Sequence, residues 1–284
     1  MKKLIPFPYF GGKFHLVDFL LSLFPEHKIY VEVFGGSGVV LLNKCPSDIE
    51  IYNDLDNRIA NFFRVIRDRD KFKEFVRIVN LCPFSRYEFE CFVNDINTDD
   101  GDDNDIVKAV KFFVVINQSF AGRLGAGFRV STTKKEVDCC LNKINNLHLI
   151  SNRFMNVVVE NYDFRKIFEL YDTEDTLFYC DPPYISETRR SNNTYSFEIT
   201  NQDHVDLCHL ARDCKGKVVI SGYDNDLYNR NLEGFIKHEK EILLSSVNIK
   251  QEKSYVKERS FAKECVWVSR SCIEKNKKQL KFLF

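Results

Sequence analysis

The chain has 284 residues, of which 44% are hydrophobic, and its 41 acidic side chains balance its 41 basic ones. This composition supplies a sizeable core and excludes an intrinsically disordered protein. The zero net charge excludes a protein that binds nucleic acid through an overall basic surface, although basic residues can still gather on one face. The ten cysteines form no Cys-x-x-Cys pair, so we expect no metal site and reduced thiols in a cytoplasmic protein.

The first 67 residues predict alternating strands and helices. The first apolar segment predicts neither a signal peptide nor a membrane span, because Pro6 and Pro8 precede it and Asp18 interrupts it. The hydrophobic spacing predicts helices and strands, in chain order, as helix 14–24, strand 29–34, a helix that begins at residue 39, strand 49–52 and helix 58–67. This alternation is typical of a mostly parallel sheet.

Residues 68–150 differ from the segments on either side and are interpreted as an insertion. They predict charged helices at 71–79, 85–92 and 107–116, an acidic loop at 95–105, and a glycine-rich basic loop or hairpin at 121–129. The sheet is then expected to resume with strands 156–159, 176–180 and 217–220, a helix at 201–212, an antiparallel pair formed by 242–249 and 263–269, and a frayed basic tail at 275–281.

The segment Asp181-Pro182-Pro183-Tyr184 follows a buried strand, at the edge of the sheet where ligands bind. Two consecutive prolines remove two backbone donors and leave neighbouring carbonyls free to accept. A carboxylate, a rigid carbonyl and an aromatic face fit an amine on a flat base: Asp181 and the Pro182 carbonyl accept its N–H groups, and Tyr184 stacks on the ring. The alternative is a Pro-Pro loop that merely closes a strand.

The turn Phe34-Gly35-Gly36-Ser37-Gly38 joins a strand to a helix, where glycines let a ligand approach free backbone N–H groups. Asp54 ends the next strand and can accept both hydroxyls of a ribose, so the turn and the acid together predict an adenosine-type ligand. Asp163 ends a third strand and either accepts from the adenine amine or N-caps a helix. Tyr9 can cover an adenine face, and Lys13 can orient a carboxylate or a carbonyl.

The basic loop contains the candidates for contact with DNA. Arg123 and Arg129, with Asn117 and Ser119, fit phosphates and base edges, although a solubilising loop is an alternative. Arg189 and Arg190 follow the Asp181–Tyr184 segment, so a substrate bound there would meet them.

Together, these segments resemble the Dam-type (class α, D12) DNA adenine-N6 methyltransferases over nearly the whole chain, and phage and mobile-element members most closely. Tyr9-Phe-Gly-Gly-Lys13 is similar to the N-terminal motif of that family, and Val31-Glu-Val-Phe-Gly-Gly-Ser-Gly38 to its cofactor loop. Asn53-Asp54 is similar to its ribose-binding acid, and Asp181-Pro-Pro-Tyr184 to its catalytic motif. Val33 stands where many members have Pro, and Asn117-Gln-Ser-Phe replaces an Asn-rich recognition hairpin, so the resemblance does not give the target sequence.

The resemblance implies a Rossmann-like α/β methyltransferase fold. Residues 1–67 and 151–284 would form the catalytic domain that binds S-adenosylmethionine, and the mainly helical insertion 68–150 would recognise the DNA target. The implied catalytic residues are Asp181, Pro182 and Tyr184. The implied cofactor-binding residues are Tyr9, Gly12, Lys13, Glu32, Phe34, Gly35, Gly36, Gly38, Asp54, Asp163 and Asp181.

The implied reaction transfers a methyl group to N6 of an adenine flipped out of double-stranded DNA, without a metal or a covalent enzyme intermediate. A bacterial, phage or mobile-element origin and a cognate restriction endonuclease as partner are expected. The alternatives are methylation of cytosine N4 or of RNA, a nicotinamide oxidoreductase and a catalytically inactive DNA-binding relative. The glycine turn lacks the G-x-G-x-x-G pattern of the oxidoreductases, and the presence of Asp54 and Asp181 argues against an inactive relative.

Overall fold

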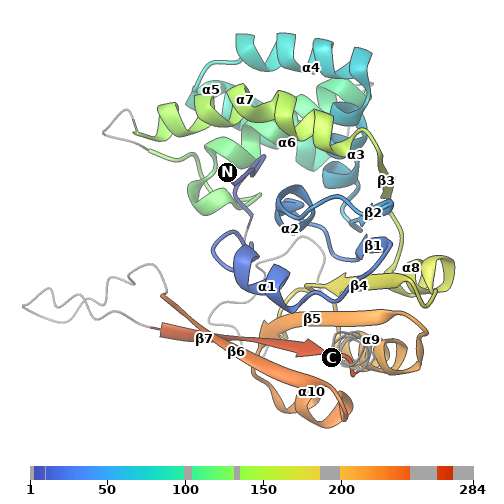
Figure 1. Cartoon of the computed structure of the whole chain (residues 1–284). Helices are drawn as coiled ribbons and strands as arrows, with labels where there is room; N and C mark the ends of the chain where they lie inside the picture. Colours follow the sequence, from blue (N-terminus) through green and yellow to red (C-terminus); the bar gives the residue numbers. More distant parts are fainter. Residues whose placement is uncertain are drawn as a thin grey trace, which may run out of the picture.

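The computed structural model describes residues 3–9, 11–98, 104–130, 135–185, 199–243 and 261–270. Seven strands within these ranges form one sheet in the order β3-β2-β1-β4-β5-β7-β6 (Figure 1). Strands β1 to β5 are parallel, whereas β7 is antiparallel to both β5 and β6. The prediction of a mostly parallel sheet is therefore confirmed. The strand bounds are β1 Ile29–Glu32, β2 Ile49–Asn53, β3 Val157–Glu160, β4 Thr176–Cys180, β5 Lys217–Tyr223, β6 Ile236–Leu243 and β7 Phe261–Val268.

Helices cover both faces of this sheet, because successive side chains of a strand point to opposite faces. On one face, Tyr30 and Tyr52 belong to a core shared with α1 (Val17–Leu23), α2 (Val39–Asn43), α3 (Asn57–Arg67), α6 (Asp105–Gln118) and α7 (Lys135–Phe154). On the other face, Val31 and Phe178 belong to a second core with α8 (Phe164–Tyr171), α9 (Asn201–Asp213) and α10 (Asp226–Asn231). The sheet is thus the middle of three layers.

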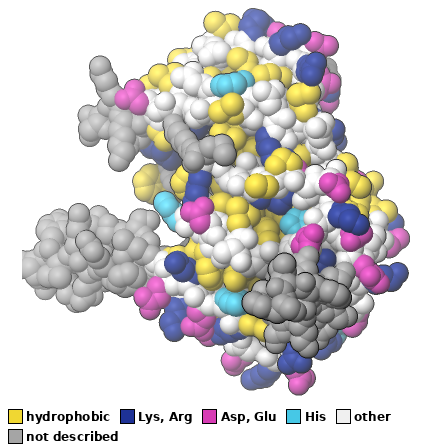
Figure 2. Space-filling view, in the orientation of Figure 1, with side chains coloured by type: hydrophobic (Ala, Val, Ile, Leu, Met, Phe, Trp, Pro, Cys, Tyr) yellow, Lys and Arg dark blue, Asp and Glu magenta, His cyan; other side chains and the backbone are white. Residues whose placement is uncertain are grey.

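A helical block packs on α3, at the top of Figure 1, and consists of α4 (Arg69–Leu81), α5 (Arg86–Thr98), α6 and α7. Aromatic rings join the block to α3: Phe62 stacks with Phe113 at 5.8 Å between ring centroids, and Phe63 with Phe154 at 4.2 Å. Figure 2 shows hydrophobic side chains gathered across the middle of the molecule, between this block and the part below it. Residue 150, where the predicted insertion ends, lies inside α7.

Several predicted boundaries change in the structure. Helix α5 extends to Thr98, into the stretch expected to be an acidic loop, and α7 and α10 were not predicted. Strand β6, at Ile236–Leu243, begins before the strand expected at 242–249 and pairs antiparallel with β7 as expected, and residues 244–249 lie outside the described ranges. The predicted tail at 275–281 lies outside the described residues. All cysteines in the described ranges are free thiols, and no helix found there is long and apolar enough to cross a membrane.

The strand order reverses between β1 and β4. From β1 the chain continues outward to β2 and β3, and it then returns to the other side of β1 with β4 and β5. Ligands of open α/β sheets bind outside the carboxyl ends of the strands at such a switch point. Here the carboxyl end of β1 leads into the glycine turn, and the carboxyl end of β4 leads into Asp181.

Candidate active site

A cavity that is open to solvent lies beyond the carboxyl ends of β1, β2, β3 and β4. Among the described residues that line this cavity, five have a carboxyl side chain and one, Lys13, has an ammonium group. The cavity therefore suits a ligand that carries positive charge. Of the residues predicted to bind a cofactor, Gly38 does not line the cavity but N-caps α2 with a φ of 63°. The others do line it, namely Tyr9, Gly12, Lys13, Glu32, Phe34, Gly35, Gly36, Asp54, Asp163 and Asp181.

The glycine turn has no room for a side chain at its first two glycines, Gly35 and Gly36. A Cβ atom on Gly35 would lie 2.1 Å from Cε2 of Tyr52, and one on Gly36, whose φ is 51°, would lie 2.8 Å from the ring of Tyr9. Tyr52 donates its hydroxyl to the Gly36 carbonyl at 2.6 Å, and the Gly35 N–H donates to the Asn53 carbonyl at 2.8 Å. The turn is thereby fixed against β2 with its backbone at the cavity surface.

Asp54 holds the same turn from the end of β2. Its Oδ2 accepts from the Gly36 N–H at 2.7 Å, and its Oδ1 accepts from the Asp56 N–H at 2.8 Å. Burial outweighs these hydrogen bonds and raises the pKa of Asp54 to about 7. Each carboxylate oxygen keeps a second lone pair that can accept from a hydroxyl of a ligand.

Two further side chains tie the end of β1 to neighbouring segments, Glu32 to α2 and Asn53 to the segment after β3. Glu32 accepts from the Tyr30 hydroxyl at 3.0 Å and from the Leu41 N–H at 2.8 Å, and burial raises its pKa to about 8. Asn53 donates to the carbonyls of Val33 and Tyr162, at 2.9 and 3.0 Å. It therefore joins the end of β1 to the segment after β3.

Asp181 lies directly after β4 and is held through one carboxylate oxygen. Its Oδ1 pairs with Lys13 Nζ at 2.7 Å and accepts from the Ser221 hydroxyl at 2.9 Å. Within the described ranges, Oδ2 of Asp181 has no hydrogen-bond partner. Burial raises the pKa of Asp181, while Lys13 and Ser221 oppose that rise.

Lys13 is the buried cation of the site. Its Nζ lies 2.7 Å from Asp181 and 3.2 Å from Glu264, and it donates to the Gly11 carbonyl at 3.0 Å and the Tyr184 hydroxyl at 2.9 Å. Burial lowers the pKa of Lys13, but the two carboxylates outweigh burial and hold this pKa well above its usual value. Lys13 therefore stays charged.

Tyr184 lies on the other side of the prolines from this cavity. Its ring stacks on Tyr223, with 4.3 Å between ring centroids and 23° between ring planes. A second cavity, of about 200 Å³, is lined by both tyrosines, by Ser221 and by Pro182 and Pro183, which also line the first cavity. The two prolines are thus a wall common to both spaces.

The remaining predicted residues occupy different surroundings. Asp163 N-caps α8 by accepting from the Arg165 N–H at 2.9 Å, and it also lines the first cavity. Asn117 and Ser119 are buried: Asn117 binds Phe113 and Lys143, and the hydroxyl of Ser119 donates to the Val115 carbonyl. These contacts support a structural role for the two side chains.

The partly buried Arg123 and Arg129 lie in the loop that follows α6, which closes with an antiparallel bridge between Ser119 and Phe128. Arg189 and Arg190 lie outside the described residues.

The sequence reasoning missed two site residues, Ser221 and Glu264. Ser221 lies near the end of β5, so the position of its strand end was an available signal. Glu264 lies in β7, and its only sequence signal is a charge, next to that of Lys263, in a largely apolar strand.

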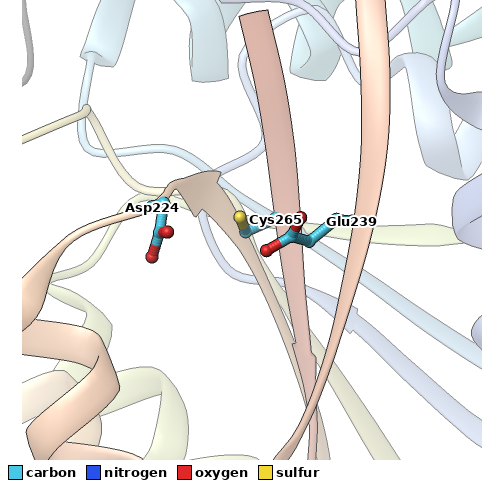
Figure 3. A group of neighbouring side chains, drawn as sticks. All are labelled: Asp224, Glu239 and Cys265. Carbon is cyan, nitrogen blue, oxygen red and sulfur yellow. The ribbon is translucent and has the colours of Figure 1, made fainter.

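A group of possible metal ligands lies outside the site, where Asp224, Glu239 and Cys265 face one another (Figure 3). The ammonium group of Lys237 already bridges the two acids, at 2.7 Å from Asp224 and 3.3 Å from Glu239. Burial also raises the pKa of Cys265 to about 11, which disfavours the thiolate that a metal would need. The group is therefore a salt-bridge cluster.

A glycine turn and strand-end acids at the switch point of a mostly parallel sheet are typical of α/β proteins that bind a nucleoside-containing ligand. The chain belongs to the D12 class N6 adenine-specific DNA methyltransferase family, whose sequence model matches residues 9–246. The three-layer architecture is accordingly a methyltransferase fold, and S-adenosylmethionine is the methyl donor that this family implies.

Two relatives are similar to the chain at low identity. Modification methylase StsI of Streptococcus sanguinis is 24% identical over 202 residues, which cover 66% of this chain and 30% of the relative. A DNA adenine methylase of Haemophilus influenzae is 25% identical over 203 residues, which cover 65% of each protein. The chain thus matches less than two thirds of the length of either relative.

Proposed function

We propose that this chain transfers a methyl group from S-adenosylmethionine to N6 of an adenine flipped out of double-stranded DNA. The observation that carries this proposal is the state of Asp181, whose Oδ1 is held by Lys13 and Ser221 while Oδ2 is left to accept from a substrate amine. The test is to incubate DNA with the protein and S-adenosylmethionine and to sequence the modified bases. N6-methyladenine at a defined site is expected, whereas N4-methylcytosine or unmodified DNA would contradict the proposal.

The larger cavity fits the methyl donor chemically. When bound, S-adenosylmethionine supplies a methyl group activated by a positively charged sulfur. The acidic lining suits that charge, Asp54 in this lining would accept from the ribose hydroxyls, and the ring of Tyr9 beside Gly36 would offer a flat surface for adenine. Asp163 would accept from the adenine amine.

The smaller cavity is where we place the target adenine. Asp181 and the Pro182 carbonyl accept the two N–H groups of the amine, which makes the nitrogen lone pair more available. Because these acceptors are already held in position, little reorganisation is needed during the reaction. For the base to stack on Tyr184, Tyr223 has to give up part of its stacking contact. The roles proposed for Asp181, Pro182 and Tyr184 require no metal.

The affinity for S-adenosylmethionine is expected to rise between pH 6 and pH 8. The pKa of Asp54 is about 7 in the unliganded protein, and hydroxyl donors stabilise its ionised form. Binding then releases a proton, so affinity increases by up to about tenfold per pH unit below the pKa. Calorimetric titrations in buffers of different ionisation enthalpy measure both the affinity for S-adenosylmethionine and the number of protons released on binding.

Asp54→Asn is the matched control for this pH dependence, because it keeps the size of the side chain and removes its titration. We expect weaker binding and a flatter pH profile between pH 6 and pH 8. An unchanged pH profile in the variant would instead assign the effect to another acid of the cavity, such as Glu32, whose pKa is about 8.

We propose that residues 68–150 recognise the DNA target, with Arg123, Arg129, Arg189 and Arg190 contacting the nucleic acid. The support is the glycine-rich loop after α6, which carries the partly buried Arg123 and Arg129 on the helical block. Phosphate contacts of this kind give affinity and orientation, and base contacts give the target sequence.

Arg123→Ala is expected to weaken DNA binding on every sequence and to reduce the salt dependence of the affinity by about one ion, while leaving S-adenosylmethionine binding unchanged. Fluorescence anisotropy at several salt concentrations measures the slope. The matched control is Lys166→Ala, which removes an exposed cation on α8 that pairs with Glu169. Equal losses of DNA and cofactor affinity in Arg123→Ala would contradict a role in DNA binding.

We also propose that methylation by this chain protects DNA from an endonuclease that cuts the same sequence, because one relative is named a modification methylase. DNA methylated by the protein should resist cleavage by one endonuclease of matching specificity.

A further inference from the structure

Glu264 is a buried carboxylate that joins the site from the antiparallel part of the sheet. It lies in β7, opposite Tyr223 of β5 and Lys240 of β6, and its side chain is 1% exposed. The residues that follow it in β7, from Cys265 to Val268, are hydrophobic core. Glu264 also lies beyond residue 246, where the match to the family model ends.

The contacts of Glu264 are with residues of the site. Its Oε1 lies 3.2 Å from Lys13 Nζ, and its two oxygens lie 3.3 and 3.4 Å from the Tyr184 hydroxyl, which donates to them. The Tyr184 hydroxyl in turn accepts from Lys13 at 2.9 Å. Glu264, Lys13 and Tyr184 therefore form a closed triangle of polar contacts, and Asp181 is attached to it through Lys13.

The charges of this group give Glu264 an electrostatic effect on Asp181. Without Glu264, Lys13 and Asp181 would form a neutral ion pair. With Glu264 ionised, one ammonium group is shared by two carboxylates, and the net charge is −1. Inside a protein such interactions are stronger than in water, so Asp181 remains a better acceptor for an amine that gains positive charge as it is methylated.

Burying a carboxylate is costly unless the group is paired and hydrogen-bonded. A neutral Gln of nearly the same size could fill this position without that cost. Burial raises the pKa of Glu264, and the ammonium group of Lys13 opposes that rise. The buried carboxyl group, directed at two residues of the site, is the observation that points to function.

We propose that Glu264 is a positioning residue for methyl transfer, which holds Lys13 and the Tyr184 ring in place and keeps the Asp181–Lys13–Glu264 group at a net charge of −1. This inference rests on the proposed function and adds to it a residue that acts on Asp181 through Lys13.

Glu264→Gln tests the inference in the full-length protein. We expect the single-turnover rate of methyl transfer to fall about 10- to 100-fold, with the dissociation constant for S-adenosylmethionine changed by less than about threefold. Glu239→Gln is the matched control, because it removes an acid from the neighbouring strand, where Glu239 pairs with lysines outside the site. That variant should keep the wild-type rate.

A double-mutant cycle with Lys13→Met separates positioning from a general loss of structure. If Glu264 acts through Lys13, Glu264→Gln will change the rate far less, or in the opposite direction, when Lys13 is already replaced. The same fold loss in both backgrounds would overturn the proposal, and so would a wild-type rate in Glu264→Gln alone.

A measurement without turnover keeps this test separate from the test of the proposed function. A buried ammonium group held by hydrogen bonds exchanges its protons slowly, so the Lys13 ammonium should give a signal in a ¹⁵N-correlated NMR spectrum, assigned by its absence in Lys13→Met. We expect the signal in wild type and in Glu239→Gln, and its loss through fast exchange in Glu264→Gln. An unchanged signal in Glu264→Gln would overturn the positioning role whatever base the enzyme methylates.

Discussion

Asp181→Ala is expected to abolish methyl transfer to DNA while leaving a folded protein that still binds S-adenosylmethionine. The substitution removes the carboxylate that lines the larger cavity directly before the two shared prolines, and with it a preorganised acceptor, whose loss costs about 10²- to 10³-fold or more in rate. The fold should survive because Lys13 keeps Glu264 as its ion-pair partner. Incorporation of a labelled methyl group measures the rate, and thermal unfolding measures the stability.

Ser221→Ala is the comparison variant for this prediction. It removes one hydrogen bond to Asp181 and keeps the carboxylate, so it should lower the rate by roughly fivefold, in line with the ~1 kcal/mol of a single hydrogen bond. Near-wild-type activity in Asp181→Ala would refute the assignment of the site. A variant that neither folds nor binds the cofactor would show that Asp181 serves structure rather than chemistry.

Gly35→Ala is expected to eliminate measurable S-adenosylmethionine binding and to destabilise the protein. The added methyl group would lie 2.1 Å from Cε2 of Tyr52. That ring cannot move aside, because it is fully buried between Phe63 and Phe154, with ring centroids 4.5 and 5.5 Å away. Either the turn or the core must shift, which costs about 1–3 kcal/mol or more. Calorimetry and thermal unfolding measure the two effects.

Gly127→Ala is the matched control for this substitution. A Cβ atom on Gly127 would meet nothing within 4 Å, and its φ lies outside the region that favours glycine. Stability and cofactor affinity should therefore stay at wild-type values. Wild-type cofactor affinity in Gly35→Ala would contradict a role of the turn as the cofactor site.

The parts of the site that could be predicted are those fixed by parallel strands. Asp54, Asp163 and Asp181 each follow a hydrophobic strand, and parallel strands bring their carboxyl ends to one edge. The sequence pattern was therefore sufficient to predict that residues far apart in the chain meet at this edge of the sheet. Their individual roles in binding and catalysis stay predictions.

Other parts depend on packing that no local pattern reveals. Glu264 reaches the site from an antiparallel strand, and a charge in a strand does not identify its partner. The start of β6 was missed because its middle is polar, Lys237 to Glu241, as is common for the edge strand of a sheet. Helix α7 was missed because few of its described side chains reach the core, mainly Ile144, Leu147, Ile150 and Phe154, among many polar ones.

The aromatic contacts between the helical block and α3 bear on how new sequence specificities arise in such a protein. Phe7, from the segment that leads to Tyr9, contacts Phe62 of α3 and Phe112 of α6, with ring centroids 5.3 and 5.2 Å apart. If the helical block recognises DNA, as proposed, it is not a cassette that can be exchanged between enzymes at residues 68 and 150. A functional graft would have to include α3 and residues 3–9. Evolution and engineering should therefore alter specificity by substitutions within the loop after α6 rather than by exchange of the whole block.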